Sequence, residues 1–132
     1  MIDSSALVTL LVFDDRLADA VEARLRKGDA FFAPSLPDYE VVSALRGIAT
    51  KDQRLTDEVV AEALADLQDL PMRRMKAEPL MPRVRQLRHS HSSYDASSIA
   101  LAEALGATLL GCDPWMGTAG GARCRIEILG AA

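Results

Sequence analysis

The segment SSYDASSIALAEALGATLLGCD, residues 92–113, contains a strong helix signal followed by the signal for a buried strand. Its first serine suits a helix cap, Asp95 stands in the first helical turn, and Gly106 is a typical helix stop. The apolar run at residues 108–112 then predicts a short strand that leads directly into Asp113. A helix that returns the chain into a strand is typical of βαβ units, so we expect a parallel sheet.

The opening of the chain follows a related pattern. Residues 1–3 form the end of a predicted strand and Ser4 and Ser5 begin a predicted helix, so Asp3 stands where strand becomes helix. Glycine and proline separate the later elements, because neither continues a helix easily. The other predicted helices run from Asp14 and Asp15 to Gly28 and over residues 35–46, 56–70 and 79–89, and the other predicted strands span residues 30–33, 71–77 and 124–129.

Length and composition predict one α/β domain over residues 1–132. Hydrophobic residues make up 49% of the chain and aromatic residues only 5%, which suits helices packed on a sheet rather than an all-β sandwich or a disordered chain. There is no signal-like basic N-terminus and no apolar run of membrane-spanning length, so we expect a cytoplasmic protein without a membrane segment. Cys112 and Cys124 lack zinc-type spacing; we expect free thiols, with a disulfide between them left open.

The chain is acidic overall but contains one basic segment. Its formal net charge is −4, which argues against general coating of nucleic acid. Residues 72–91 nevertheless carry six basic side chains against the single acid Glu78. Such a segment suits contacts with phosphate groups, and it equally suits a solvated helix face or a contact between subunits.

Four carboxylates are predicted to lie at one edge of the sheet. Asp3 and Asp113 each follow a predicted strand, whereas Glu40 and Asp95 each fall near the start of a helix. In a parallel sheet the strand ends and the starts of the following helices meet at the carboxyl edge, where open α/β folds bind ligands. Two like charges about 4 Å apart repel by roughly 1 kcal/mol in water and roughly 4 kcal/mol near a protein surface, so the cluster needs a cation or raised pKa values.

Oxygen ligands of this kind favour Mg²⁺ or Mn²⁺, which can lower the pKa of a water and stabilise charge on a scissile phosphate. Taken singly, each acid also has a simpler role. Asp3 can cap the helix after it, and Asp95 can complement the helix dipole. Glu40 can be a solvated helix residue and Asp113 an ordinary turn residue. Asp38, close to Glu40, is expected to face solvent.

Several short motifs occur in an order that is specific as a set. They are IDSSAL at residues 2–7, APSL at residues 33–36 followed by Glu40 and Val41, ALR at residues 44–46, and the stretch from Tyr94 to Asp113. This ordered set covers almost the whole chain. It resembles the VapC toxins, the ribonuclease halves of bacterial toxin–antitoxin pairs within the PIN-domain family.

The resemblance implies a PIN-like α/β/α sandwich with a central, mostly parallel sheet of about four or five strands flanked by helices. It implies an endoribonuclease that uses Mg²⁺ or Mn²⁺ and hydrolyses RNA phosphodiester bonds with a metal-activated water. A VapB-type antitoxin and a homodimer are the implied protein partners, and Ser5 is an implied supporting contact. The implied catalytic residues and metal ligands are Asp3, Glu40, Asp95 and Asp113.

Two departures from the family pattern leave alternatives open. Gly111 stands where many relatives have Ser or Thr two residues before the fourth acid, and Pro114 and Trp115 stand where a further acid often follows. These departures motivate a catalytically silent PIN module that binds RNA or a protein partner, and another metal-dependent phosphohydrolase is a third alternative. Trp115 could stack on a base, but a hydrophobic role beside the site is expected for it. The candidates for RNA contacts are Arg73, Arg74, Arg85 and Arg88.

Overall fold

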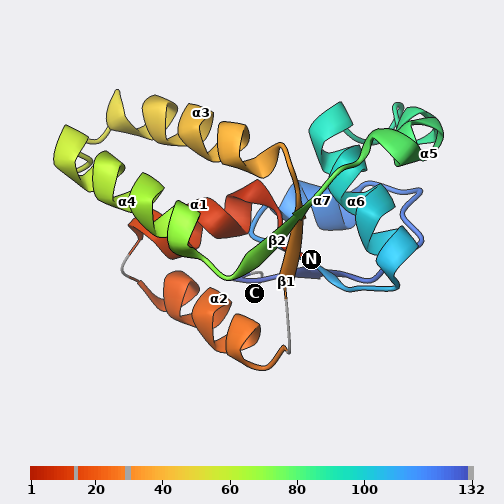
Figure 1. Ribbon diagram of the computed structural model, residues 1–132, viewed down its shortest axis with the longest axis horizontal. Coiled ribbons are helices and arrows are strands. Elements are labelled where there is room, and N and C mark those ends of the chain that lie inside the picture. Colours follow the sequence, from red (N-terminus) through yellow and green to blue (C-terminus); the bar gives the residue numbers. More distant parts are fainter. Residues whose placement is uncertain (14, 29–30, 131–132) are drawn as a thin grey trace.

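A computed structural model describes residues 1–13, 15–28 and 31–130, and shows short strands between two groups of helices (Figure 1). The predicted cap at Asp14 and the predicted strand start at Ala30 lie outside the described residues. The helices are α1 (Ser4–Val12), α2 (Arg16–Arg26), α3 (Pro37–Ala49), α4 (Asp57–Asp69), α5 (Met81–Gln86), α6 (Ser93–Leu105) and α7 (Pro114–Thr118), with a 3-10 turn η1 (Glu78–Leu80) before α5. The strands are β1 (Phe31–Pro34), β2 (Met72–Met75), β3 (Leu109–Gly111) and β4 (Ile126–Ile128).

The strands form two parallel pairs that the N-terminal segment joins. β1 pairs with β2, and β3 pairs with β4. Between the pairs, Ile2 forms a parallel bridge with Leu110, and its N–H donates to the Phe32 carbonyl at 2.9 Å. The N–H of Asp3 donates to the Leu110 carbonyl at 3.0 Å. The order across the sheet is therefore β2, β1, residues 1–3, β3 and β4, which confirms the predicted parallel α/β architecture.

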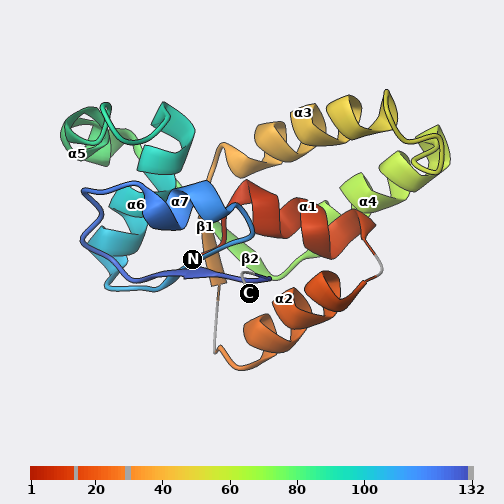
Figure 2. The ribbon, with the colours of Figure 1, turned by 180° about the vertical axis from the view of Figure 1, so that it is seen from behind.

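Helices cover both faces of this sheet. Figures 1 and 2 show α1–α4 on one side of the strands and α5–α7 on the other. Each side has its own buried core, and neighbouring residues of the strands point into different cores: Met1 and Phe32 into one, Ile2 and Ala33 into the other. This alternation follows from the pleat of an extended chain, in which successive side chains face opposite sides.

The helix boundaries lie close to the predicted ones. Asp15 and Ser92 accept hydrogen bonds from backbone N–H groups in the first turns of α2 and α6. Gly106 ends α6 in the left-handed conformation, with φ of 61°. Helix α7 was not predicted: Asp113, for which an ordinary turn was the simpler role, caps this helix by accepting from the N–H of Trp115.

The state of the two cysteines and the absence of a membrane segment were also predicted from the sequence. Cys112 and Cys124 are free and half-buried, as predicted, so the alternative of a disulfide between them was wrong. No helix in the described part of the chain combines the length and the hydrophobicity that crossing a membrane requires.

Two glycines give opposite expectations for the same substitution. Gly106→Ala places a side chain where φ is +61°, so we expect the free energy of unfolding to fall by about 1 kcal/mol. Gly47→Ala lies inside α3, where a Cβ would meet nothing within 4 Å, so we expect a gain of about 0.5–1 kcal/mol. Urea denaturation of the two variants and the parent protein measures both changes. A gain in stability from Gly106→Ala would contradict the left-handed conformation of Gly106, and a loss from Gly47→Ala would contradict the open surroundings of Gly47.

Candidate functional site

Asp3 is the most buried of the four predicted acids, with 4% of its surface exposed. It caps α1: its Oδ1 accepts from the N–H of Ala6 at 3.0 Å, and the Ser5 hydroxyl lies 2.8 Å from both carboxylate oxygens. Burial raises the pKa of Asp3 to about 6, although the hydrogen bonds from Ala6 and Ser5 lower it; the charges of Asp95 and Glu40 raise it further. A charged Asp3 is therefore costly to the fold.

Glu40 lies beside Asp3 in the first turn of α3 and is half-buried. The Ser4 hydroxyl donates to its Oε2 at 3.1 Å, which links the start of α1 to the start of α3. Burial raises the pKa of Glu40, the hydrogen bond from Ser4 lowers it, and the charge of Asp95 raises it. Ser4 could not be identified from the sequence, because its partner is 36 residues away and no spacing rule connects them.

Asp95 and Asp113 approach this pair from other elements. Asp95 lies in the first turn of α6, and its charge acts on both Asp3 and Glu40. Asp113 follows β3 and is exposed, because its Oδ1 accepts from the Trp115 N–H at 2.9 Å and caps α7. The fold thus brings Asp3, Glu40 and Asp95 within electrostatic reach of one another, and it places Asp113 at the rim.

Ser5 and Gly111 hold Asp3 close to the strand that leads to Asp113. The Ser5 hydroxyl donates to Asp3 and also accepts from the N–H of Cys112 at 2.9 Å. A Cβ on Gly111 would lie 3.0 Å from the Asp3 Oδ2, which is a tight contact with a side chain that is already held in place. The absence of a side chain at Gly111 therefore lets the Asp3 carboxylate approach the backbone of β3.

The chemistry of the four acids fits a divalent cation. None of them forms an ion pair with Lys or Arg in the part of the chain that the structure describes. Carboxylate oxygens are the ligands that Mg²⁺ and Mn²⁺ prefer. In the present rotamers, however, no three acidic, His or Cys side chains among the described residues are placed to share one ion. Sharing an ion requires Glu40, Asp95 or Asp113 to turn toward Asp3, which its hydrogen bonds hold in position.

The four arginines named as candidates for RNA contacts do not form one surface. Arg74 makes a bidentate ion pair with Asp38, with distances of 2.6 and 2.9 Å, and Asp38 still faces solvent in part, as expected, with 32% of its side chain exposed. Arg73 lines a cavity between α2 and the end of α4. Arg85 and Arg88 line a different cavity, together with the start of α6, the helix that carries Asp95. This pair therefore borders the start of the helix that carries Asp95.

Trp115 is 70% exposed in the first turn of α7, beside Asp113. The hydrophobic role expected for it stays a prediction, because the ring is largely open to solvent. The exposed ring, next to an acid of the site, equally suits the alternative of stacking against a base.

Comparison with known proteins gives matches along nearly the whole sequence. Residues 1–116 match the PIN domain family. The chain is 33% identical to Ribonuclease VapC12 of Mycobacterium tuberculosis, over 98% of each protein, and 32% identical to VapC ribonuclease Mb0985 of Mycobacterium bovis, over 98% of this chain and 97% of the relative. The structure resembles that of PAE2754 from Pyrobaculum aerophilum, with a TM-score of 0.65, 22% identity, and coverage of 95% of this chain and 86% of that one. The match and the structural likeness confirm the predicted PIN-like α/β/α fold.

Asp3→Asn should stabilise the protein in a pH-dependent way. The Asn side chain keeps the acceptor for Ala6 but removes the buried charge. The folded pKa of about 6 lies above the ordinary value of 3.8, so the parent protein loses stability as the pH rises from about 4 to about 6 and pays the full cost above that. We expect the variant to exceed the parent by up to about 3 kcal/mol at pH 7 in the presence of a chelator, with little difference near pH 4.

Urea denaturation across this pH range measures the difference in free energy of unfolding. Asp113→Asn is the matched control, because it makes the same change at a helix cap that is exposed. We expect a smaller dependence on pH in that pair. A difference between Asp3→Asn and the parent that stays constant from pH 4 to pH 8 would contradict the buried charge.

Proposed function

We propose a ribonuclease function for this chain, which belongs to the VapC group of the PIN-domain family. Relatives named as ribonucleases align with it over almost their full length. The observation that carries the proposal is the group of Asp3, Glu40 and Asp95, which act on one another electrostatically and have no cationic partner among the described residues. Uncompensated acids at the carboxyl edge of a parallel sheet suit metal-assisted chemistry on a phosphate.

We propose that Asp3, Asp95 and Asp113 hold Mg²⁺ or Mn²⁺, and that Glu40 ligates it through water or orients the attacking water. Such an ion lowers the pKa of a bound water and stabilises the charge that develops on the scissile phosphate. Asp3 supplies the immobile end of the ligand set, since Ser5 and Ala6 hold its carboxylate. The burial that raises its pKa also favours a cation beside it, because a positive charge offsets the cost of the buried carboxylate.

The other residues of the chain position the groups that react. Ser4 holds Glu40 through Oε2, and Oε1, which accepts no hydrogen bond from the described residues, would be available to a water. Arg85 and Arg88 are placed to hold RNA phosphates beside the start of α6. In the proposed reaction the oxygen of the water bonds to phosphorus, and the bond from phosphorus to the leaving ribose oxygen breaks. The products are two shorter RNA strands.

The proposed function also comprises a biological role, a cellular location and protein partners. We propose that the chain is the toxin of a toxin–antitoxin pair, acts in the cytoplasm, and binds a VapB-type antitoxin and a second copy of itself. We also propose that residues 1–132 form a single PIN domain. Support for the last point comes from β4, which lies beyond the matched residues 1–116 and yet completes the sheet by pairing with β3.

A catalytically silent module that binds RNA or a protein is the alternative. The observation in its favour is that no three potential ligands among the described residues share one point in their present rotamers. Titration calorimetry with Mn²⁺ separates the two cases. A silent module binds no metal at micromolar to millimolar concentrations, or binds it without turnover.

Purified protein should cleave single-stranded RNA with Mg²⁺ or Mn²⁺ and stop when a chelator is added. Asp3→Asn and Asp95→Asn should each lower kcat/KM by about 100-fold or more, because each removes a charge that stabilises the cation and the transition state. Asp19→Asn, an exposed acid in the first turn of α2, is the control and should retain full activity. Undiminished cleavage by both site variants in pure preparations would show that the site is assigned wrongly.

Arg85→Gln with Arg88→Gln should weaken RNA binding and make it less dependent on salt. Each lost phosphate contact should reduce the slope of log K against log salt by about 0.7 for a single strand. Fluorescence anisotropy with labelled RNA, in an Asp95→Asn background that does not cut, measures this slope. Arg54→Gln is the control, because Arg54 is exposed and pairs with Asp52 in the connection between α3 and α4. An unchanged slope in the double variant would exclude phosphate contacts by this pair.

A further inference from the structure

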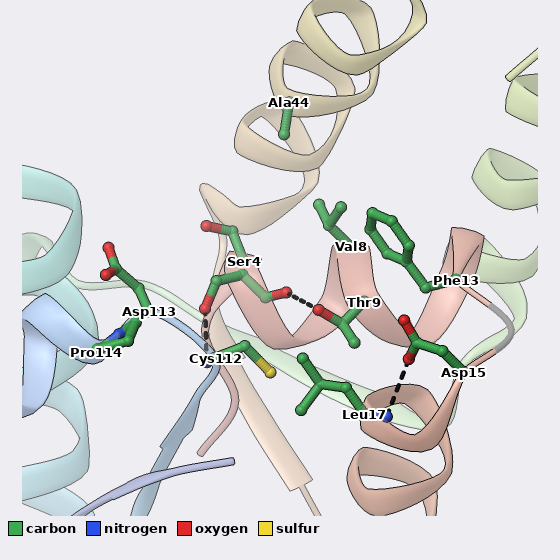
Figure 3. Close-up of a pocket in the computed structure, with 11 residues that line it drawn as sticks. Ser4, Val8, Thr9, Phe13, Asp15, Leu17, Ala44, Cys112, Asp113 and Pro114 are labelled. Carbon is green, nitrogen blue, oxygen red and sulfur yellow. Dashed lines mark hydrogen bonds between the residues drawn. The ribbon is translucent and has the colours of Figure 1, made fainter. Parts of the chain in front are cut away.

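A cavity of about 610 Å³ opens beside the proposed catalytic acids. It lies between the start of α1, the start of α2 and the connection from β3 to α7. Figure 3 shows Asp113 and Pro114 on one side of it, and Phe13 and Asp15 on the opposite side. Its volume is in the range of cavities that take small organic ligands.

The cavity is continuous with the carboxylate group. Ser4 lines the cavity and donates its hydroxyl hydrogen to Glu40. Ser5 also lines it and holds Asp3, while Asp113 is itself one of its walls. A phosphate that lies at the carboxylates therefore has this cavity directly beside it. The nucleoside attached to that phosphate can reach into the cavity.

The walls of the cavity suit a flat aromatic ring. Val8, Leu17 and Pro114 contribute apolar surface. Phe13 stands at the end of α1, where 43% of its surface is exposed and open to a ligand. An exposed aromatic ring beside a nucleic-acid site offers a stacking platform that accepts any base.

Asp15, on the side of the cavity opposite Asp113, carries a carboxylate that can only accept hydrogen bonds. The Asp15 carboxylate takes hydrogen bonds through Oδ1 from the N–H groups of Leu17 and Ala18, as the cap of α2. No cation pairs with Asp15 in the described ranges. Its negative charge disfavours a phosphate in the cavity, and its second oxygen suits an N–H donor. Exocyclic amino groups of bases are donors of this kind. Uracil lacks an exocyclic amino group, and its ring N3–H lies between two carbonyl oxygens that a carboxylate repels.

We propose that this cavity receives the base next to the scissile phosphate, with Phe13 stacking on the ring and Asp15 accepting from an exocyclic amino group. The proposal rests on the ribonuclease function and names a determinant of its specificity. It follows that cytosine, adenine or guanine is favoured over uracil at this position. One carboxylate contact of this type gives a discrimination of about tenfold.

Binding of free nucleosides tests the cavity without any cleavage. In a chelator, cytidine and uridine are titrated into the ¹⁵N-labelled protein and followed by NMR. Cytidine should bind about tenfold more tightly than uridine and shift the amide signals of Phe13 and Leu17. Asp15→Asn keeps the cap of α2 and should remove the preference, whereas Asp19→Asn, on the same helix but outside the cavity, should keep it. Phe13→Ala should weaken both nucleosides by about the same factor.

Mapping of cut sites in a randomised RNA with Mn²⁺ separates failure of this proposal from failure of the ribonuclease function. Cleavage with a preference that Asp15→Asn and Phe13→Ala leave unchanged would overturn the cavity assignment and leave the ribonuclease function standing. Absence of cleavage together with selective cytidine binding would support the cavity and overturn the ribonuclease function. Nucleosides that leave the Phe13 and Leu17 signals unshifted would overturn the proposal. So would a Phe13→Ala variant that changes the oligomeric state, because a second copy would then fill the cavity.

Discussion

The hydrogen bonds of residues 1–3 hold the sheet together. β1 pairs only with β2, and β3 only with β4, among the described residues. The N–H of Ile2 donates to β1, the N–H of Asp3 donates to β3, and the terminal ammonium group donates to the Thr108 carbonyl at 3.1 Å. Because Ile2 is fully buried between the two cores, the hydrophobic effect and the hydrogen bonds favour the same position for this segment. The position of Asp3 follows from that docking.

Asp3 shows a compromise between stability and the proposed chemistry. The docking that completes the sheet also buries a carboxylate, and burial of a charge is unfavourable unless partners compensate it. Ser5 and Ala6 compensate part of the cost, and the absence of a side chain at Gly111 leaves room for the carboxylate. A local arrangement that costs stability in this way is typical of functional sites. The buried and only partly compensated charge of Asp3 therefore gives the four acids a physical reason to attract a cation. The simpler role of Asp3 as a helix cap does not provide such a reason.

The two cavities near the acids differ in chemistry, because one is largely apolar and the other is lined by two arginines. On the side of α1 and α7, the cavity is largely apolar and ends in the Asp15 carboxylate, which suits a base. On the side of α6, Arg85 and Arg88 line a cavity at the start of the helix, which suits phosphates. Asp113 borders the first surface, and Asp95 belongs to the helix that begins at the second. An acidic protein can thus offer separate places to the base and to the backbone of one RNA strand.

The order of most secondary-structure elements, and whether each is a helix or a strand, follow from the sequence alone, because helix caps, helix stops and apolar periodicity act locally. Ser92, Gly106 and the apolar run before Asp113 were enough to predict α6 and β3. Helix α7 was missed because Asp113 and Pro114 suit a turn as well as a helix start. Three features depend on tertiary packing and could not be predicted from the sequence: the contact of Ser4 with Glu40, the pairing of Arg74 with Asp38 and the cavity beside Phe13. These join segments far apart in the chain, and their geometry depends on how two helical layers pack against one sheet rather than on any local preference.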